Sequence, residues 1–191
     1  YSSGFQDSAI ITHDGFSTGF SYHSGLVLYG KNNNLYPLSP NHLSIGTLYM
    51  SVAIMLNLGG FGEGKLMGLA PYGKPHFFNQ DFVENWCGIG RRFNAEQFRL
   101  WNKYCYTTAK NNGYDMSALG DKDKITDPIN VDIAASTQKL FEECYLYTVK
   151  VFHSLLANSG INTNNLCITG GTALNCPSNS KIYNEGPFKN L

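Results

Sequence analysis

Asp14 and Gly15 are the first residues along the chain whose types and position suggest chemistry. They end the β-prone run at 8–13, so the carboxylate stands at the end of a predicted strand. A carboxylate there can hold a cation or meet a nucleotide phosphate through a metal ion, and Gly15 lets a ligand come close to the backbone. Asp-Gly is also a common turn pair, so an ordinary turn is the alternative.

Residues 62–73, with the sequence GEGKLMGLAPYG, combine several glycines with an acid and a base at a predicted helix start. Glycine destabilises a helix, so this composition indicates a backbone that something approaches closely. The helix N-terminus would offer N–H groups to an anion, and Glu63 could accept hydrogen bonds from ribose hydroxyls. The stretch lacks the Gly-x-x-x-x-Gly-Lys-Ser/Thr pattern of a P-loop. A tightly packed elbow between two helices is the alternative.

Gly170 and Gly171 stand between a predicted strand and a predicted helix. A turn of this kind can present backbone amides to a phosphate group. Asn175 would lie one turn into the helix, where its side chain could face the same ligand. A tight strand-to-helix turn without a ligand is the alternative.

The histidines and cysteines form no recognisable ligand set. His13 adjoins Asp14, but neighbouring side chains on a strand point to opposite faces, so the two would not readily share one metal ion. None of the 5 histidines pairs at His-x-x-x-His spacing, and none of the 5 cysteines pairs at a zinc-ligand spacing. Reduced, mostly buried thiols are expected.

The hydrophobic pattern predicts the elements that position these residues. Short apolar runs separated by turn residues predict an antiparallel meander of three or four strands, at 8–13, 19–22, 25–29 and 35–38. Helical spacing predicts a helix from Ser44 to the glycine-rich stretch and a second, shorter helix at 63–70.

The second half of the chain predicts a helix laid against this sheet. Asp127-Pro128 opens a long helix that runs to about Ser159, and its wide apolar face is typical of packing on a sheet. A buried strand at 165–169 and a helix at 172–183 follow, which completes an α/β plan. Residues 74–128 have a mixed pattern and are predicted to be an insertion, helical or irregular.

Composition excludes several classes of protein. Formal net charge is 0, from 14 basic and 14 acidic residues, so no electrostatic footprint for nucleic acid or an anionic membrane is present. No apolar stretch is long enough to span a bilayer, which predicts a cytoplasmic protein. Both ends of the sequence look cut, so we expect a fragment of a longer protein.

Three blocks of the sequence resemble the carbamoyltransferase family, which includes nodulation-factor and antibiotic O-carbamoyltransferases. The block most specific to this family is GEGKLMGLAPYG at 62–73. The three blocks also occur in the same order as in the family. The other two blocks are SAIITHDG at 8–15 and the pair DIAAS at 132–136 with LCITGGTALNC at 166–176.

The resemblance implies an actin-like ATPase (RNase H-like, ASKHA) fold, here an incomplete fragment with a mixed sheet flanked by helices. It implies ATP-dependent transfer of a carbamoyl group from carbamoyl phosphate, through a carbamoyl-adenylate, to a hydroxyl of a small metabolite or sugar. Asp14 would be one ligand of a divalent metal, iron in this family. Nucleotide contacts would come from Gly15, Glu63, Lys65, Gly170, Gly171 and Asn175.

The chain departs from the family pattern in ways that bear on its activity. Phe16-Ser17-Thr18 stands where the family often has Gly and Glu. The other expected metal ligands, a His-x-x-x-His pair and a second Asp, would lie outside these residues, and so would the YrdC-like domain. We therefore expect residues 1–191 to be part of one actin-like domain that is inactive alone. The alternatives are a sugar kinase or ATPase of the same fold, or a non-catalytic nucleotide-binding scaffold; an oligomer is possible.

Overall fold

The computed structural model describes residues 3–15, 24–87 and 95–191. They divide into two compact units. The first unit contains Tyr1–Gly46, Asn85–Phe93 and Glu142–Leu191, and the second contains Thr47–Glu84 and Asn94–Phe141. Each unit is described by itself.

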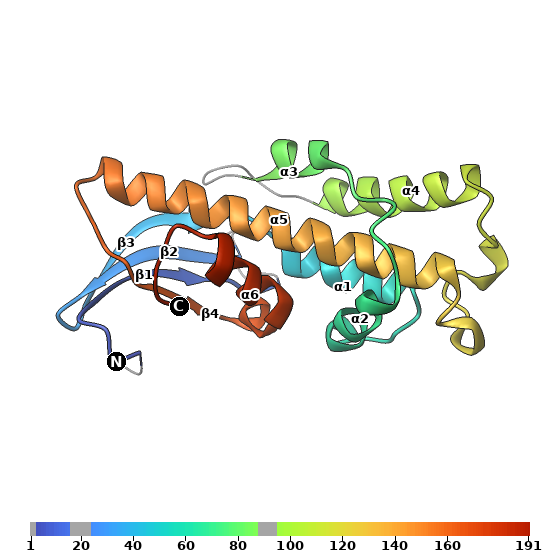
Figure 1. Cartoon of the computed structure of the whole chain (residues 1–191), viewed down its shortest axis with the longest axis horizontal. Helices are drawn as coiled ribbons and strands as arrows, with labels where there is room; N and C mark the ends of the chain where they lie inside the picture. Colours follow the sequence, from blue (N-terminus) through green and yellow to red (C-terminus); the bar gives the residue numbers. More distant parts are fainter. Residues whose placement is uncertain (1–2, 16–23, 88–94) are drawn as a thin grey trace. The chain divides into compact units, whose positions relative to one another are not determined.

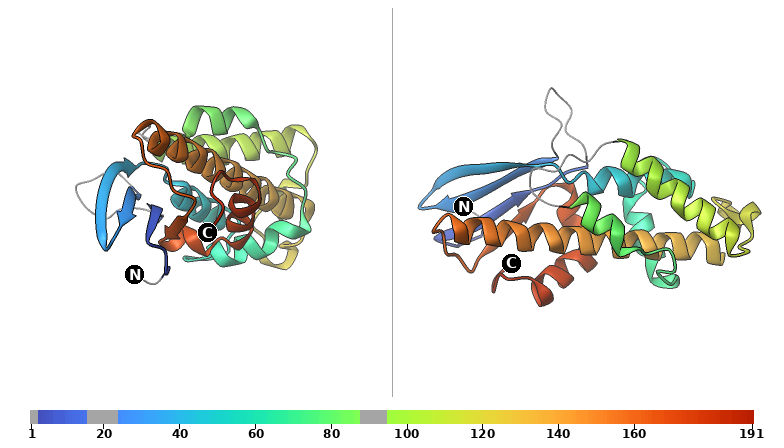
Figure 2. Two further views of the ribbon diagram at one scale, coloured as in Figure 1. Left: turned by 60° about the vertical axis from the view of Figure 1, so that its left-hand side comes forward. Right: turned by 90° about the horizontal axis from the view of Figure 1, so that it is seen from above.

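The first unit is built on a mixed four-stranded sheet of order β3-β2-β1-β4 (Figure 1). The strands are β1 (Asp7–Thr12), β2 (Gly25–Lys31), β3 (Asn34–Asn41) and β4 (Leu166–Thr169). β1 pairs antiparallel with β2 and parallel with β4, and β2 pairs antiparallel with β3. The three meander strands lie side by side in both views of Figure 2. This arrangement places the ends of β1 and β4 next to each other.

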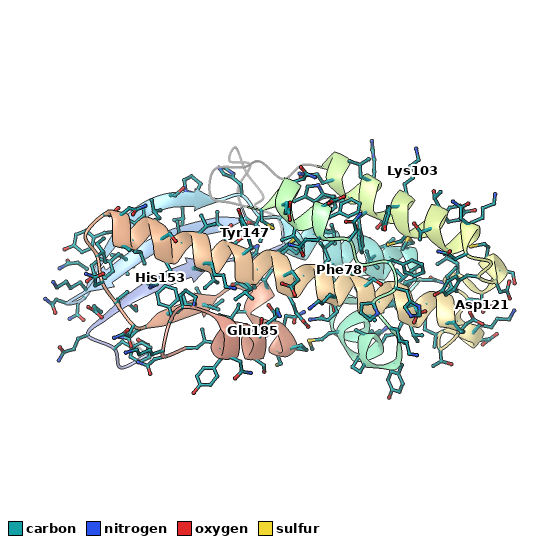
Figure 3. All side chains as sticks on the ribbon, turned by 45° about the horizontal axis from the view of Figure 1, so that its top comes forward. Phe78, Lys103, Asp121, Tyr147, His153 and Glu185 are labelled. Atoms are coloured by element: carbon teal, nitrogen blue, oxygen red, sulfur yellow. The ribbon has the colours of Figure 1, made fainter. Side chains whose placement is uncertain are left out.

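Two helices of the first unit accompany the sheet. They are the part of α5 (Pro128–Asn158) from Glu142 onwards and α6 (Cys176–Glu185). Val149 and Phe152 of α5 are fully buried. Ala9 and Ile11 of β1 are also fully buried, and they share one side of the sheet because alternate residues of a strand face the same way. Lys181 on α6 lies 2.8 Å from Glu185, labelled in Figure 3, and 3.3 Å from Glu143 on α5.

The second unit is helical. Its elements are α1 (Ile45–Met55, whose first two residues belong to the first unit), α2 (Glu63–Leu69), η1 (Ala70–Tyr72), α3 (Gln80–Trp86, whose last two residues belong to the first unit), α4 (Ala95–Asn111), η2 (Met116–Ala118), η3 (Lys122–Lys124) and the start of α5. Trp101 of α4 is fully buried, and its indole Nε1–H donates to Thr137 Oγ1 of α5 at 3.1 Å. Lys103, labelled in Figure 3, is exposed, as expected for a charged residue of an amphipathic helix.

The structure confirms the α/β plan, the meander and the long helix. The run at 19–22 lies outside the described residues. The helix expected at 172–183 is partly wrong, because a 3-10 helix, η4 (Gly171–Leu174), precedes α6, and α6 begins only at Cys176. The predicted insertion at 74–128 holds α3 and α4. Among the described residues, no helix is both long and apolar enough to cross a membrane.

Candidate functional site

Asp14 lies just beyond the end of β1 with its side chain exposed. The backbone around it is fixed on both sides: His13 N–H donates to Thr169 O of β4 at 2.7 Å, and Asp14 N–H donates to Ser24 O at 2.8 Å. Asp14 Oδ1 accepts from the N–H of Gly15 at 2.7 Å. The carboxylate is therefore held in place by its backbone while remaining open to solvent.

Gly171 lies directly against the Asp14 carboxylate and Gly170 against the backbone of His13, so the structure brings these predicted residues together. Gly170 has a φ of 103°, in the region that favours glycine, and a Cβ added to it would lie 2.2 Å from His13 O. A Cβ added to Gly171 would lie 2.8 Å from Asp14 Oδ1. Any side chain at either position would push the Asp14 segment away from the turn after β4.

Two residues that the sequence reasoning missed complete this contact. Thr172 donates to His13 O from its N–H at 3.2 Å and from its hydroxyl at 2.7 Å. Gly46, near the start of α1, has space for no side chain either, since an added Cβ would lie 2.8 Å from Gly15 Cα and 3.0 Å from Thr172 Cγ2. A glycine in the first turn of a predicted helix was the available signal for Gly46.

His13 is buried beneath this junction and is neutral. Its Nε2–H donates to Leu43 O, and its ring meets the ring of Tyr145 edge-on with centroids 5.0 Å apart. Burial lowers the pKa of His13 to about 4, although the Leu43 carbonyl and the charge of Asp14 oppose this shift. His13 is buried and Asp14 exposed, which confirms that the two side chains point apart. His13 therefore supports the site from the core side.

Asn175 has a structural role that the sequence reasoning did not give it. It is the N-cap of α6, and its side-chain oxygen accepts from Ser178 N–H at 3.0 Å. It therefore precedes α6 and does not lie one turn inside a helix. Asn before a helix with Pro177 in the first turn is the expected capping pattern.

Glu63 and Lys65 lie in the first turns of α2, in the second unit. Lys65 is exposed, and its ammonium donates to Leu58 O at 3.1 Å. Space is open around Gly64 and Gly68, while Leu66 and Leu69 of the same helix are buried. One face of α2 therefore packs into its unit and the glycine-bearing face does not.

The described residues contain no group of three or more His, Cys, Asp or Glu side chains that could hold a metal ion. Asp14 can supply one carboxylate oxygen, the kind of ligand that hard and borderline cations accept. A metal ion bound here would therefore take one ligand from Asp14 and its other ligands from elsewhere.

Comparison of the sequence with known proteins shows which family the chain belongs to. The sequence profile described as "Carbamoyltransferase N-terminus" matches residues 2–191. The chain belongs to the carbamoyltransferase family. That assignment confirms the resemblance drawn from the three sequence blocks, and the junction of Asp14 with Gly170 and Gly171 joins two of those blocks in space.

Three proteins are similar to nearly the whole chain. Nodulation protein NolNO of Sinorhizobium fredii (strain NGR234) is 31% identical over 99% of this chain and 26% of its own length. An uncharacterized protein of Synechocystis sp. (strain PCC 6803) is 29% identical over 100% of this chain and 31% of its own length. Nodulation protein NolO of Bradyrhizobium diazoefficiens is 28% identical over 99% of this chain and 32% of its own length. The chain spans about a quarter to a third of the length of these relatives.

Proposed function

We propose that the protein carrying this chain is an ATP-dependent O-carbamoyltransferase. It would transfer the carbamoyl group of carbamoyl phosphate, through a carbamoyl-adenylate, to a hydroxyl of a small metabolite or sugar. Family membership supports carbamoyl transfer. The single observation that carries the site is the contact of Gly171 with the Asp14 carboxylate, where an added Cβ would come within 2.8 Å of Oδ1.

The proposed fold of the complete domain is the actin-like ATPase fold. An antiparallel meander followed by a parallel partner for β1 supports this proposal, as does the strand–Gly-Gly–helix turn beside an aspartate. Fold alone would not fix the activity, so the proposal rests on the residues at the junction.

At the junction, the chain would orient phosphate and metal. Gly170 and Gly171 leave the turn after β4 without side chains, so the backbone there can approach a phosphate group. Asp14 and Gly15 would bind beside the same phosphate group, with Asp14 as one ligand of a divalent metal, proposed to be iron. When bound, the metal would stabilise negative charge that develops as the acceptor oxygen attacks.

Other residues would bind the nucleotide or position the turn. Glu63 and Lys65 are proposed to bind the nucleoside side of ATP, because they lie beside the open glycine face of α2. Asn175 would act through α6, which it caps, and so would set the turn's geometry more than touch the ligand. Thr172 would fix the turn on the His13 carbonyl.

The experiment is to incubate the full-length protein with ATP, carbamoyl phosphate and ferrous iron and to identify the nucleotide product. AMP and pyrophosphate that form only with carbamoyl phosphate support adenylate chemistry. ADP would contradict the proposal and indicate a kinase or ATPase, and the absence of both turnover and ATP binding would indicate a scaffold. A protein with the Asp14→Asn change serves as the control for metal-dependent turnover.

A further inference from the structure

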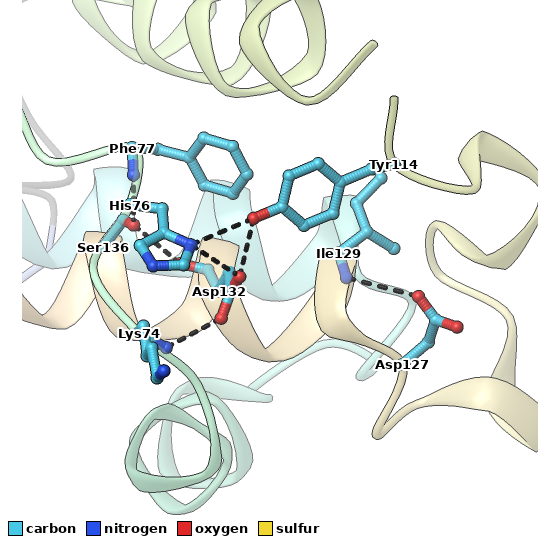
Figure 4. Close-up of polar contacts among 8 residues, drawn as sticks. All are labelled: Lys74, His76, Phe77, Tyr114, Asp127, Ile129, Asp132 and Ser136. Atoms are coloured by element: carbon cyan, nitrogen blue, oxygen red, sulfur yellow. Dashed lines mark hydrogen bonds and ion pairs between the residues drawn. The ribbon is translucent and has the colours of Figure 1, made fainter. Parts of the chain in front are cut away.

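A buried aspartate in the second unit holds the segment that follows the glycine-rich motif (Figure 4). Asp132 lies in the first turns of α5 and is only 7% exposed. Its Oδ1 accepts from the backbone N–H of Lys74 at 2.7 Å, and its Oδ2 accepts from the Tyr114 hydroxyl at 2.7 Å. His76 Nδ1 lies 3.2 Å from the same Oδ2 and 3.2 Å from the Tyr114 oxygen. Both carboxylate oxygens are therefore engaged.

Ser136, one helical turn beyond Asp132, holds the same segment at a second point. Its hydroxyl accepts from Phe77 N–H at 3.0 Å and donates to Asp132 O at 2.7 Å, as Figure 4 shows. Residues four apart on a helix lie on one face, so Asp132 and Ser136 can both bind the same neighbouring segment. Gly73 makes the close approach possible, because a Cβ added to it would lie 2.0 Å from Val131 O. Residues 73–77 thus lie directly on α5.

This segment is continuous with α2, where nucleotide contacts are proposed. Leu66 N–H donates to Gly62 O at 2.9 Å at one end of the motif, and Gly73 N–H donates to Ala70 O at 3.2 Å at the other. The helical hydrogen bonds of α2 and η1 connect these ends. A displacement of the backbone at residue 73 or 74 would therefore also displace Glu63 and Lys65, because the consecutive helices α2 and η1 connect them.

The Tyr114 hydroxyl of this network stays protonated well above neutral pH. Burial, together with the hydrogen bond to Asp132 and the charge of Asp132, raises the pKa of Tyr114 to about 12, so its hydroxyl remains a donor at neutral pH. Hydrogen bonds to a buried charged group are stronger than neutral ones, and a buried carboxylate is costly unless it is paired. An apolar side chain at this position would leave Lys74 N–H and the Tyr114 hydroxyl without this acceptor, so the carboxylate fixes the segment by hydrogen bonds that packing alone does not supply.

We propose that Asp132 is a positioning residue: with Ser136 and Gly73, it clamps residues 73–77 to α5 and so sets the position of α2 and its nucleotide-contacting residues. The inference rests on the proposed function and adds a residue that touches neither substrate nor metal. It also links DIAAS, through Asp132 and Ser136, to the residues that directly follow GEGKLMGLAPYG.

The test compares four variants of the full-length protein: Asp132→Ala, Asp132→Asn, Ser136→Ala and, as the matched control, Asp123→Ala. Asp123 is an exposed aspartate of the same unit. Amide hydrogen exchange is measured at residues 63–78, and KM for ATP and kcat are measured from carbamoyl-phosphate-dependent AMP formation. Asp132→Ala should speed exchange at the Lys74 amide by about 10- to 100-fold, since one charge-assisted hydrogen bond is lost.

Kinetics separate positioning from stability. Asp132→Ala should raise KM for ATP about tenfold, with a smaller change in kcat. Asp132→Asn keeps an oxygen acceptor for Lys74 N–H and should restore most of this loss, to within about threefold of wild type. Asp123→Ala should change none of these quantities. A fall in kcat in proportion to the folded fraction, with KM unchanged, would overturn the proposal, as would normal exchange at residues 63–78.

Ser136→Ala and hydrogen exchange test the same contact independently of Asp132→Ala and of AMP formation. If Asp132→Ala does not fold, Ser136→Ala removes the acceptor for Phe77 N–H with little change in volume and should raise exchange and KM in the same direction. If wild-type protein forms no AMP, the proposed function fails, while exchange at residues 63–73 still decides whether Asp132 positions the motif.

Discussion

Asp14 and Asp132 carry the same carboxylate in opposite surroundings. Asp14 is exposed, and the hydrogen bond to its carboxylate within the described residues comes from the backbone of the next residue. Asp132 is buried, and its two oxygens take hydrogen bonds from Lys74 and Tyr114 with His76 beside them. A carboxylate whose oxygens are already engaged holds structure, whereas one with an open side can take a ligand.

The glycines near the two aspartates, Gly171 and Gly73, differ in the same way: one leaves space at a carboxylate and the other at a backbone contact. Gly171 clears space at the Asp14 carboxylate itself, so the missing side chain leaves room around a charged group. Gly73 clears space at the backbone of Val131, so the missing side chain lets two pieces of main chain touch. Similar sequence features would therefore serve ligand access in the first unit, under the proposed function, and they serve the docking of residues 73–77 on α5 in the second.

The largest expected effect separates the two aspartates directly. Asp14→Asn should reduce AMP formation by about 1000-fold, because a neutral amide is a poor metal ligand and a poor partner for developing charge. Its unfolding temperature should stay within about 1 °C of wild type, since the side chain is exposed. Asp132→Asn should show the reverse pattern, with a lower unfolding temperature and activity reduced by less than about tenfold. Parallel thermal scans and product assays decide this, and equal behaviour of the two variants would contradict the division.

The next effect tests whether the turn beside Asp14 depends on glycine. Gly170→Ala should lower the free energy of unfolding by about 4 kcal/mol, because alanine disfavours this backbone conformation and its Cβ would meet His13 O. Urea denaturation measures the change. Gly60→Ala is the control, because nothing lies within 4 Å of a Cβ there. A loss as small as that of the control would show that the turn can move aside.

The third effect is a pH dependence that belongs to the first unit. Burial lowers the pKa of His13 to about 4, whereas the unfolded chain takes up this proton near the ordinary histidine pKa of 6.5. The unfolded state therefore binds more protons between these values, and the free energy of unfolding should fall by about 3 kcal/mol as pH drops from about 6.5 to 4. Denaturation curves across this range measure the fall. In His13→Gln this contribution should vanish, and an unchanged pH dependence would assign it to other groups.

The sequence predicted local elements better than their contacts. Asp127-Pro128 at one end and Gly160 at the other bounded α5, and Gly160 has the positive φ expected after a helix. Asp14 and the glycine pair were each marked by local composition. Their meeting was not, because it depends on the parallel pairing of β1 with β4, and the bond from Thr172 to His13 spans 159 positions.

The capping role of Asn175 was readable but was overlooked in favour of a ligand role. The Asp132 network was not readable, because its partners Lys74 and Tyr114 lie 58 and 18 positions away in a stretch without strong periodicity. Polar contacts between distant segments leave no mark on hydrophobic spacing, so they emerge only when the chain is folded.

The discontinuity of the first unit has a consequence for how the protein folds. Its segments, Tyr1–Gly46, Asn85–Phe93 and Glu142–Leu191, are separated by the two segments of the second unit. Closing a long loop is entropically unfavourable, and non-local strand pairing is slow. On the ribosome, β1 and its meander would emerge early and wait with one edge unpaired until β4 is made. We therefore expect amides of the β1–β4 ladder to gain protection last in pulse-labelled refolding, which makes this edge the part of the nascent chain most exposed to aggregation.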